Sequence, residues 1–596
     1  MRSAPRRAPT FTQSFASGRD DLTPTPTAPE RALRPVDFAT LSEALDGAAQ
    51  GPTGVNIHSA RGELIEVLPY AKLREQAVAL AARYLALGLE PGDRVALAAD
   101  SSGDFLRAFF ASQYAGLAPV PTPLPAPLGG KEAYVEHIRR MLVSGDVRAA
   151  LAPAELAAWF AEAGEDLPLL AAGAWSDLPA TGERALPPPD PEGLCYLQYS
   201  SGSTRFPVGV AVTQGALAAN VLAIGGPGGL AVGAADRAVS WLPLYHDMGL
   251  VGMLLTGMAF QVSIDLMPTA AFVRRPSLWL DLISERGGSI SYAPTFGYDL
   301  AARRAAALNL ADYDLSSWRI AGVGGDMVRP GPLRAFAEAL EPAGFDPAAF
   351  VASYGMAEAT LALTLTPPGQ GLQVDAADLE RLEQAKVAGP VRPGGRAREF
   401  ALCGKVLAGH SLEVRGDGGQ ILPERGVGGI FAKGPSLMKA YYGAPEETRR
   451  VLSADGWLDT GDLGYRLGEE IVITGRAKDL IIVNGRNVWP QDLEWTAERQ
   501  IEVLRSGDVA AFQVTGDDGD RVVALVQCRT RETDKRIALR TSVAGILRAA
   551  HGVEVDVVLT PPHSLPQTSS GKLSRSRART LYLSGAFDDQ TQSLAV

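Results

Sequence analysis

Apolar residues recur along this chain at the spacings of helices and of strands. Between residues 73 and 85 they return every three or four positions, which predicts an amphipathic helix that the glycines and proline of 88–92 terminate. A short apolar run at 94–98 predicts a strand, residues 105–114 predict a second helix, and 119–123 predict another extended segment. This part of the chain therefore alternates between strands and helices.

The same alternation returns between residues 148 and 332, and it indicates the fold class. Strands that alternate with helices predict an α/β protein with parallel, doubly wound sheets, whose ligands bind at loops beyond the carboxyl ends of the strands. The apolar run Leu194–Gln198 predicts one such strand. We expect the loop of residues 199–204, which follows it, to lie at that edge of a sheet.

After residue 365 the pattern changes twice. Residues 366–399 have proline and glycine near both ends and one charged helical piece at 375–386, so we interpret them as an insertion. Residues 400–442 predict short strands joined by glycine turns, typical of a small β subdomain. Beyond residue 476 the pattern predicts a small, separate α+β domain, with strands at 480–483, 508–515, 521–527 and 553–559 and a helix at 536–549.

These patterns divide the 596 residues into a large and a small domain with tails. Residues 1–36 contain six arginines and six prolines without apolar periodicity, so we expect a flexible tail there. The large domain is expected at 37–475 and the small one at 479–585. A second tail would follow at 586–596.

Composition excludes several classes of protein. The net charge of -11 and the pI near 5.3 argue against a dedicated nucleic-acid binder. The three cysteines are far apart and the six histidines lack ligand spacing, so we expect neither a disulfide framework nor a zinc site. The apolar run at 248–262 is too short to span a bilayer. With no secretory signal either, we expect a cytoplasmic protein.

The loop after residue 199 carries the first candidate chemistry. It places four hydroxyls and one glycine together, in Ser200, Ser201, Gly202, Ser203 and Thr204. Such a loop can turn backbone N–H groups and hydroxyls toward one phosphate, and glycine lets the backbone approach closely. The spacing is not that of a Walker loop. The alternative is an ordinary serine-rich surface turn.

Two downstream stretches suit a carboxylate substrate and a magnesium ion. The imidazole of His246, beside Asp247, can steer an anionic carboxylate, although a capping aspartate beside a packed histidine is the alternative. Glu358, in the stretch 353–360, can hold Mg²⁺ on a polyphosphate. Its alternative role is that of a carboxylate at a helix N-terminus.

Two glycine-containing turns suit a nucleotide. In 321–326, Ala-Gly-Val-Gly-Gly-Asp, bare backbone after a strand suits the close approach of a flat ring, or else forms a plain turn. In 456–464, Asp462 can accept both hydroxyls of a ribose, or else belongs to an ordinary Asp/Gly turn.

The last two stretches carry basic residues. Residues 474–487 place charges at the domain boundary, where a solvated linker is the alternative interpretation. Lys572 lies in the Ser/Gly-rich stretch 566–575, and such a lysine is usually solvated and without a role.

Taken in this order, the stretches resemble the adenylate-forming superfamily, which includes acyl-CoA synthetases, luciferases, peptide-synthetase adenylation domains and fatty acyl-AMP ligases. The resemblance spans roughly residues 40–580. Within this superfamily the chain is most similar to the fatty acyl-AMP ligases, in the stretches YSSGSTRFPVGVAVT, SWLPLYHDMGL and GRAKDLIIVNGRNVWPQDLE. Val208 stands where acyl-CoA synthetases commonly have the lysine of Thr-Gly-x-Pro-Lys-Gly. Fatty acyl-AMP ligases typically carry an insertion in the large domain that is linked to failure to use CoA, and residues 366–399 are our candidate for it.

The resemblance implies a role for each matching residue. ATP and AMP would be bound by Ser200, Ser201, Gly202, Ser203, Thr204, Gly325, Asp326, Ser353, Tyr354, Gly355, Met356, Asp462 and Arg476. Among these, the loop residues would hold the phosphates, and Asp462 and Arg476 the ribose. Glu358 would bind Mg²⁺, His246 would lie near the carboxylate entrance, and Lys572 would bridge the acyl carboxylate and the α-phosphate. Lys478 would be the hinge, within 476–478, about which a mobile small domain rotates.

The implied reaction is the ATP- and Mg²⁺-dependent adenylation of a fatty acid. A carboxylate attacks the α-phosphorus, pyrophosphate leaves, and the acyl group then passes to the phosphopantetheine thiol of an acyl carrier protein. The alkyl chain would be lined by Gly252, Met253, Gly257 and Met258, which otherwise form a core helix. The implied partners are thus a fatty acid and a carrier protein.

Three alternatives remain at this point. An acyl-CoA ligase differs only in the thiol that it accepts. A non-catalytic adenylate-binding or carrier-docking protein belongs to another class, against which the intact Glu358, Asp462, Arg476 and Lys572 count. An amino-acid adenylation domain usually has an acidic residue for the substrate amine, and Asp247 is too ambiguous to serve as one.

Overall fold

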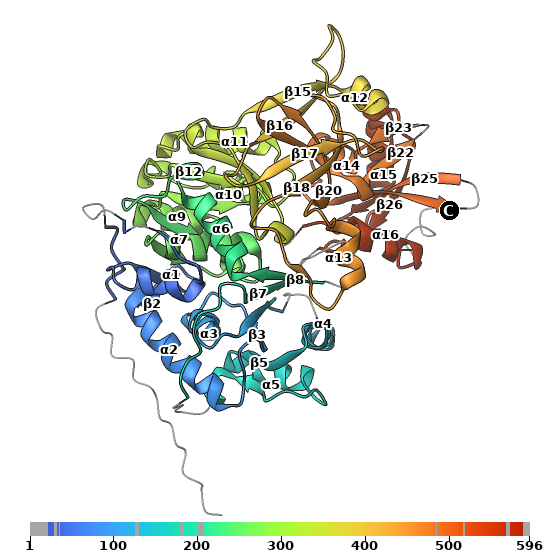
Figure 1. Ribbon diagram of the computed structural model, residues 1–596. Coiled ribbons are helices and arrows are strands. Elements are labelled where there is room, and N and C mark those ends of the chain that lie inside the picture. The colour runs from blue at the N-terminus through green and yellow to red at the C-terminus, as the bar shows by residue number, and fades with distance from the viewer. Residues whose placement is uncertain are drawn as a thin grey trace, which may run out of the picture.

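The computed structural model describes residues 22–28, 33–34, 36–125, 130–178, 184–199, 208–483, 485–516, 519–567 and 572–587. Its elements form a large N-terminal body and a smaller C-terminal domain, drawn in red at the edge of the molecule in Figure 1. Within the described ranges, no helix combines the length and apolar character needed to cross a bilayer.

A mixed sheet forms the centre of the large body. Across the sheet its strands are β17 (Ser411–Arg415), β18 (Gly428–Lys433), β20 (Leu458–Leu467), β21 (Glu470–Arg476), β16 (Ala397–Val406), β14 (Ala362–Leu365), β13 (Phe350–Gly355), β12 (Ile320–Val323), β11 (Ile290–Ala293), β9 (Arg237–Ser240), β10 (Ser263–Leu266), β1 (Gly54–His58) and β2 (Leu64–Pro69). From β13 to β1 neighbouring strands run parallel, and from β14 to β17 they run antiparallel. The predicted α/β class is confirmed. The strands β16, β17 and β18 of the predicted β subdomain at 400–442 belong to this same sheet.

A second sheet is parallel throughout, as its sequence pattern predicts. It contains β4 (Ala118–Thr122), β3 (Arg94–Ala98), β5 (Val147–Ala152) and β6 (Ala171–Ala174). The helices predicted at 73–85 and 105–114 are α2 (Tyr70–Ala86) and α3 (Gly103–Tyr114), which pack on each other. The apolar positions of α3 include Phe105, Phe109 and Phe110, all fully buried, so this helix belongs to the core of the large body.

The strand before the serine-rich loop belongs to a different sheet from the one predicted. β7 (Leu194–Tyr199) pairs antiparallel with β8 (Gly209–Thr213), which pairs in turn with β19 (Ala440–Tyr441). The expectation that this loop follows a strand of a parallel, doubly wound sheet is therefore wrong, because an apolar run does not reveal the direction of its neighbour. Ser200, Ser201, Gly202, Ser203 and Thr204 themselves lie outside the described residues.

The candidate insertion, 366–399, contains a strand that the sequence pattern missed. β15 (Val374–Asp378) pairs antiparallel with β16, and only then does α12 (Leu379–Ala385) begin. The predicted helix at 375–386 is thus wrong in its first four residues. Asp378 Oδ1 accepts a hydrogen bond from Arg381 N at 3.0 Å and caps the helix. Asp375 therefore lies before the helix, and Asp378 lies at its start.

The C-terminal domain has its own apolar core, which includes the fully buried Leu493, Val509 and Leu547. Its elements are β22 (Ile481–Val483), β23 (Arg486–Val488), α14 (Pro490–Gln500), β24 (Val509–Gly516), β25 (Gly519–Gln527), α15 (Thr533–His551), β26 (Val555–Thr560) and α16 (Arg575–Leu583). The α+β domain predicted beyond residue 476 is present.

Part of the predicted N-terminal tail packs on the large body. Thr25 is buried: its N–H donates to Asn56 Oδ1 at 2.9 Å, and its carbonyl accepts from Arg237 Nη1 at 2.8 Å. Residues 22–28 therefore belong with the fold, and the flexible tail expected at 1–36 does not extend through them.

Candidate active site

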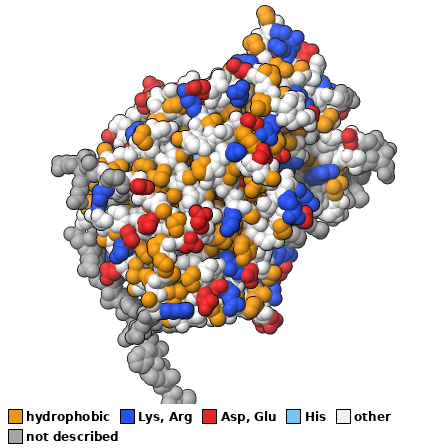
Figure 2. All heavy atoms as spheres, viewed as in Figure 1, with side chains coloured by type: hydrophobic (Ala, Val, Ile, Leu, Met, Phe, Trp, Pro, Cys, Tyr) orange, Lys and Arg blue, Asp and Glu red, His pale blue; other side chains and the backbone are white. Residues whose placement is uncertain are grey.

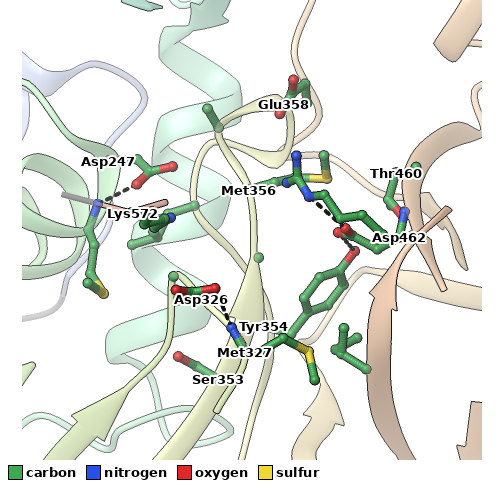
Figure 3. Close-up of a pocket in the computed structure, with 18 of the residues that line it drawn as sticks. Asp247, Asp326, Met327, Ser353, Tyr354, Met356, Glu358, Thr460, Asp462 and Lys572 are labelled. Atoms are coloured by element: carbon green, nitrogen blue, oxygen red, sulfur yellow. Dashed lines mark hydrogen bonds and ion pairs between the residues drawn. The ribbon is translucent and has the colours of Figure 1, made fainter. Parts of the chain in front are cut away.

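A cavity of about 610 Å³ lies between the large body and the C-terminal domain. Its wall includes Gly325, Tyr354, Glu358 and Asp462 from the large body and Lys572 from the C-terminal domain. The close-up in Figure 3 labels the last four of these residues around the cavity. Its volume is that of a small-molecule site. Gly325 and Lys572, which are 247 positions apart in the sequence, therefore face one cavity.

One side of the cavity is a cross-strand ion pair. Asp462 of β20 lies opposite Arg476 of β21 in the strand register, and Arg476 Nε is 3.1 Å from Asp462 Oδ1. The hydroxyl of Tyr354 donates to Asp462 Oδ2 at 2.9 Å. Burial raises the pKa of Asp462, and the charge of Arg476 opposes this. Both residues lie in the wall of the cavity, so the pair presents a fixed carboxylate and a cation.

Bare backbone forms the neighbouring wall. Gly325, after β12, has a φ of +77°, a conformation that favours glycine. A Cβ on Gly325 would lie 3.4 Å from Met248 Cε and 3.8 Å from Lys572 Nζ. A Cβ on Gly324 would come within 2.4 Å of Ser353 Oγ. Gly325 therefore leaves its part of the wall without a side chain, whereas glycine at 324 lets β12 pack closely against Ser353 of β13.

The other predicted nucleotide residues lie along the same edge. Asp326 is exposed, and its Oδ1 accepts from Met327 N at 2.8 Å. Ser353 Oγ donates to Val323 O at 3.1 Å, which joins β13 to β12. Gly355 and Met356 follow at the end of β13, and all four residues line the cavity.

Glu358 is held by a residue that the motifs did not reveal. It lies in the short 3₁₀ turn Ala357–Ala359, and its Oε1 accepts from the hydroxyl of Tyr441 at 2.7 Å. Burial raises the pKa of Glu358. Tyr441 is 83 positions away in the sequence, on β19, so no local pattern could have assigned it to the site.

The structure decides the geometry of His246 and Asp247. Asp247 Oδ1 accepts from Met248 N at 2.7 Å and caps the π-helix Met248–Leu255, and His246 Nδ1 lies 2.7 Å from the same oxygen. Burial would raise the pKa of Asp247, but His246 and, more weakly, Lys572 outweigh it and lower the pKa. The capping aspartate is therefore present, and His246 nevertheless lines the cavity.

Two lysines reach the cavity from the region of the domain boundary. Lys572 lies beside Gly325, close enough for its Nζ to meet a side chain built there. Lys478, in the 3₁₀ turn Ala477–Asp479, is exposed and also lines the cavity. Lys572 is the sequence-predicted residue that brings the C-terminal domain into the site.

The four residues predicted for an alkyl pocket separate into three positions. Gly252 lines the main cavity, together with the apolar side chains of Leu230 and Leu361. Leu230 and Gly252 also line a second void of about 10 Å³, which Met253 and Gly257 border. Met258 is fully buried and lines neither of these two voids. Leu230 and Gly252 thus separate the two voids.

Comparison with known proteins agrees with this geometry. A family model described as AMP-binding enzyme matches residues 57–442. A protein of Caulobacter vibrioides named "putative acyl-CoA synthetase" is 59% identical over 566 residues, which are 95% of this chain and 99% of that protein. A long-chain-fatty-acid–AMP ligase of Mycolicibacterium smegmatis is 33% identical over 575 residues, covering 87% and 89% of the two chains.

A solved structure also matches closely. It comes from a study of fatty acyl-adenylate ligases from E. coli and L. pneumophila, is 41% identical, and covers 93% of this chain and 99% of that chain with a TM-score of 0.88. The family model, the relatives and the solved structure all indicate an adenylate-forming enzyme, and residues of both domains line the cavity. The chain therefore belongs to the AMP-binding, adenylate-forming ligases, which activate a carboxylic acid as its adenylate.

Proposed function

We propose that this chain is a fatty acyl-AMP ligase that passes its acyl group to the phosphopantetheine thiol of an acyl carrier protein. One observation carries the adenylation step: Lys572 shares a cavity with Glu358 and the Asp462–Arg476 pair. A carboxylate and a triphosphate repel each other, and cations fixed where charge develops favour their approach.

The nucleotide would lie along the wall from Gly325 to Asp462. The open backbone at Gly325 would take one face of the adenine, and the ring of Tyr354 would lie near it. Asp462 would accept the ribose hydroxyls, since Tyr354 and Arg476 already hold its carboxylate in one orientation. Such a fixed acceptor loses little freedom when the nucleotide binds.

In the reaction, a carboxylate oxygen of the fatty acid forms a bond to the α-phosphorus of ATP. The bond from that phosphorus to the bridging oxygen breaks, and pyrophosphate leaves with the electron pair. Lys572 would donate N–H groups to the acyl carboxylate and to an α-phosphate oxygen. His246 would lie on the carboxylate side. Holding the reactants in line supplies much of the rate enhancement.

Glu358 is the proposed ligand of Mg²⁺. Its hydrogen bond from Tyr441 engages one carboxylate oxygen, Oε1, and burial penalises its charge. The described residues contain no cluster of three or more His, Cys, Asp or Glu side chains that could hold a metal alone. One carboxylate with phosphate oxygens and water suits Mg²⁺. The bound ion would neutralise negative charge on the polyphosphate.

The alkyl chain would extend toward Gly252. The apolar side chains of Leu230 and Leu361 border the main cavity on that side. A Cβ on Gly252 would come within 3.0 Å of Leu361 Cδ2, so glycine keeps this passage wide. We therefore assign the fatty acid, with its carboxylate near Lys572, to this arm of the cavity.

Two features favour a carrier protein over CoA. Val208 replaces the lysine that is common in acyl-CoA synthetases. The candidate insertion bonds to the C-terminal domain: Asn487 Nδ2 donates to Glu383 O at 3.2 Å, and Arg486 Nη1 donates to Glu383 Oε2 at 3.3 Å. These bonds favour the present orientation of the C-terminal domain, and they would give the candidate insertion, which the resemblance links to failure to use CoA, a way to act on that domain. An acyl-CoA ligase is the second candidate, because of the relative named for that activity at 59% identity.

The deciding experiment compares the two thiols. The protein is incubated with ATP, Mg²⁺ and fatty acids of increasing length, with CoA or with a phosphopantetheinylated carrier protein, and the products are identified by mass spectrometry. We expect acyl-AMP that persists with CoA and moves to the carrier. Abundant acyl-CoA would establish the second candidate. No pyrophosphate with any fatty acid would instead favour a non-catalytic adenylate binder.

A further inference from the structure

We infer that Arg575 is a positioning residue for adenylate formation: it ties the segment that carries Lys572 to the hinge and to α14. The inference rests on the role proposed above for Lys572. Arg575 is the first residue of α16 and lies three positions after that lysine. None of the motifs singled out a role for it.

The guanidinium of Arg575 joins two carboxylates. Its Nε donates to Glu494 Oε1 at 2.8 Å and its Nη2 donates to Glu494 Oε2 at 2.7 Å, a bidentate pair. Its Nη1 donates to Asp479 Oδ2 at 3.1 Å. Side-chain exposure is 17% for Arg575, 3% for Glu494 and 15% for Asp479. Paired charges with this little exposure, in a fork geometry, hold orientation better than exposed ones.

These bonds link the segment that carries Lys572 to the hinge turn and to α14, whose relative positions place Lys572 in the cavity. Asp479 belongs to the turn Ala477–Asp479, next to the predicted hinge residue Lys478. Glu494 lies on α14, and its Oε1 also accepts from Ala511 N of β24 at 3.0 Å. Arg575 therefore connects α16 with the hinge turn, α14 and the sheet of the C-terminal domain.

The chain between Lys572 and Arg575 is also anchored. Leu573 packs against the core formed by the second face of the C-terminal sheet, and Ser574 N donates to Pro566 O at 2.9 Å. Three residues span at most about 10 Å, so fixing Arg575 confines the backbone of Lys572. The same segment borders the cavity from Lys572 to Ser576.

Arg575 itself is not assigned to the reacting atoms. Its guanidinium is engaged with Glu494 and Asp479, and it acts on the reaction through the placement of Lys572. A displacement of about 1 Å at a catalytic group can cost on the order of 100-fold in rate. Loss of this link should therefore slow the step that needs Lys572 and spare the step that does not.

The test separates the two half-reactions. Pyrophosphate release from ATP and fatty acid reports adenylation, and transfer from synthetic acyl-AMP to the carrier thiol reports the second step. We expect Arg575→Ala to reduce kcat of adenylation by on the order of 100-fold, with KM for the fatty acid and the transfer rate within a few-fold of wild type. Arg575→Lys should recover part of the loss. The matched control is Arg579→Ala, an exposed arginine of the same helix, which should match wild type.

A double variant shows whether Arg575 acts through Lys572. If it does, Lys572→Ala/Arg575→Ala adenylates no more slowly than Lys572→Ala alone, because the displaced group is already absent. Thermal unfolding of each variant checks the fold, and Arg575→Lys replaces Arg575→Ala in the cycle should the alanine variant not fold.

Three results would overturn the inference. Wild-type adenylation by Arg575→Ala would do so, as would equal loss of both half-reactions, or a double variant slower by the full product of the single effects. Absence of pyrophosphate release from the wild-type protein would instead overturn the proposed function, and the inference with it.

Discussion

Asp462 and Arg476 face each other across β20 and β21, and Arg476 Nε lies 3.1 Å from Asp462 Oδ1. The second carboxylate oxygen accepts from Tyr354, on β13. The side chain of Asp462 is 8% exposed, whereas that of Arg476 is 47% exposed. The pair therefore fixes a buried carboxylate at the edge of the cavity and leaves its cation open to a ligand.

The first prediction concerns this carboxylate. Asp462→Asn removes the charge that would accept the ribose hydroxyls. A hydrogen bond to a charged group contributes about 1.5–3 kcal/mol, so we expect KM for ATP to rise ~10–100-fold. Steady-state pyrophosphate release measures this. Asp455→Asn, on the exposed turn before β20, should keep the wild-type KM, and an unchanged KM in Asp462→Asn would remove that residue from the nucleotide site.

The second prediction concerns Lys572. Lys572→Ala should lose ~100–1,000-fold in adenylation, the cost typical of removing one donor from a developing negative charge. Transfer from synthetic acyl-AMP to the carrier should continue at close to the wild-type rate, because no α-phosphate attack is involved. Lys535→Ala, an exposed lysine of the same domain, is the control. Equal loss in both half-reactions would contradict the assigned role.

The third prediction concerns Glu358 and Mg²⁺. Glu358→Gln should raise the Mg²⁺ concentration for half-maximal rate by at least ~10-fold, because even residues beyond the metal ligands cost about 10–100-fold. Titration of the rate with Mg²⁺ measures this. Glu446→Gln, on the exposed face of α13 (Pro445–Val451), serves as control. Wild-type Mg²⁺ dependence in Glu358→Gln would exclude the assignment.

The pH profile tests the same carboxylate. Burial raises the pKa of Glu358, and only the ionised form binds a cation, so the rate should fall on acidification at a pH above the ordinary glutamate pKa of 4.5. The raised pKa means that protonation, and hence the loss of rate, begins at higher pH, not lower. An acid limb that persists unchanged in Glu358→Gln would assign it to another group.

The fourth prediction concerns chain length. Gly252→Val should narrow the arm beside Leu361 and shift preference toward shorter fatty acids. Each methylene is worth about 0.8 kcal/mol, so excluding two should lower kcat/KM for the longest good substrate by ~10-fold. Leu230→Ala should shift preference the other way by opening the second void. Gly228→Val, in an exposed turn, is the control, and an unshifted profile in both test variants would place the alkyl chain elsewhere.

The fifth prediction concerns stability. Burial and the neighbouring Glu494, opposed by Arg329, raise the pKa of Glu498 from 4.5 to about 8. The folded state then binds the proton of Glu498 more tightly than the unfolded state does. The contribution of this group to the free energy of unfolding is therefore fully present below pH 4.5 and is lost as pH rises through about 8. Thermal unfolding at several pH values should show a weaker decline in Glu498→Gln than in wild type. The exposed Glu502→Gln should follow wild type, and parallel curves for Glu498→Gln would contradict the shift.

Local pattern predicted much of the fold, and most of its errors concern strand pairing. The helix at 73–85 follows from periodicity, because burial on one face selects apolar residues at fixed spacing, and the strand at 94–98 follows from an apolar run. The helix at 105–114 is also present. The direction of β7 and the strand β15 were missed, since pairing depends on a neighbour that is distant in the sequence. The predicted helix at 375–386 begins too early, because residues 375–378 precede α12 and Asp378 is its N-cap.

The candidate site divides in the same way. The sequence by itself determined which chemical groups are present and in what order, because a carboxylate, an imidazole or a bare glycine turn has its chemistry wherever it lies. Only the tertiary structure decided which of them meet: Tyr441 with Glu358, Asp462 with Arg476 and Tyr354, and Lys572 with Gly325. Asp462 and Arg476 lie on the two strands of one hairpin, but Tyr354, Tyr441 and Lys572 reach their partners from distant parts of the chain. For those contacts packing, rather than spacing along the chain, sets the distances.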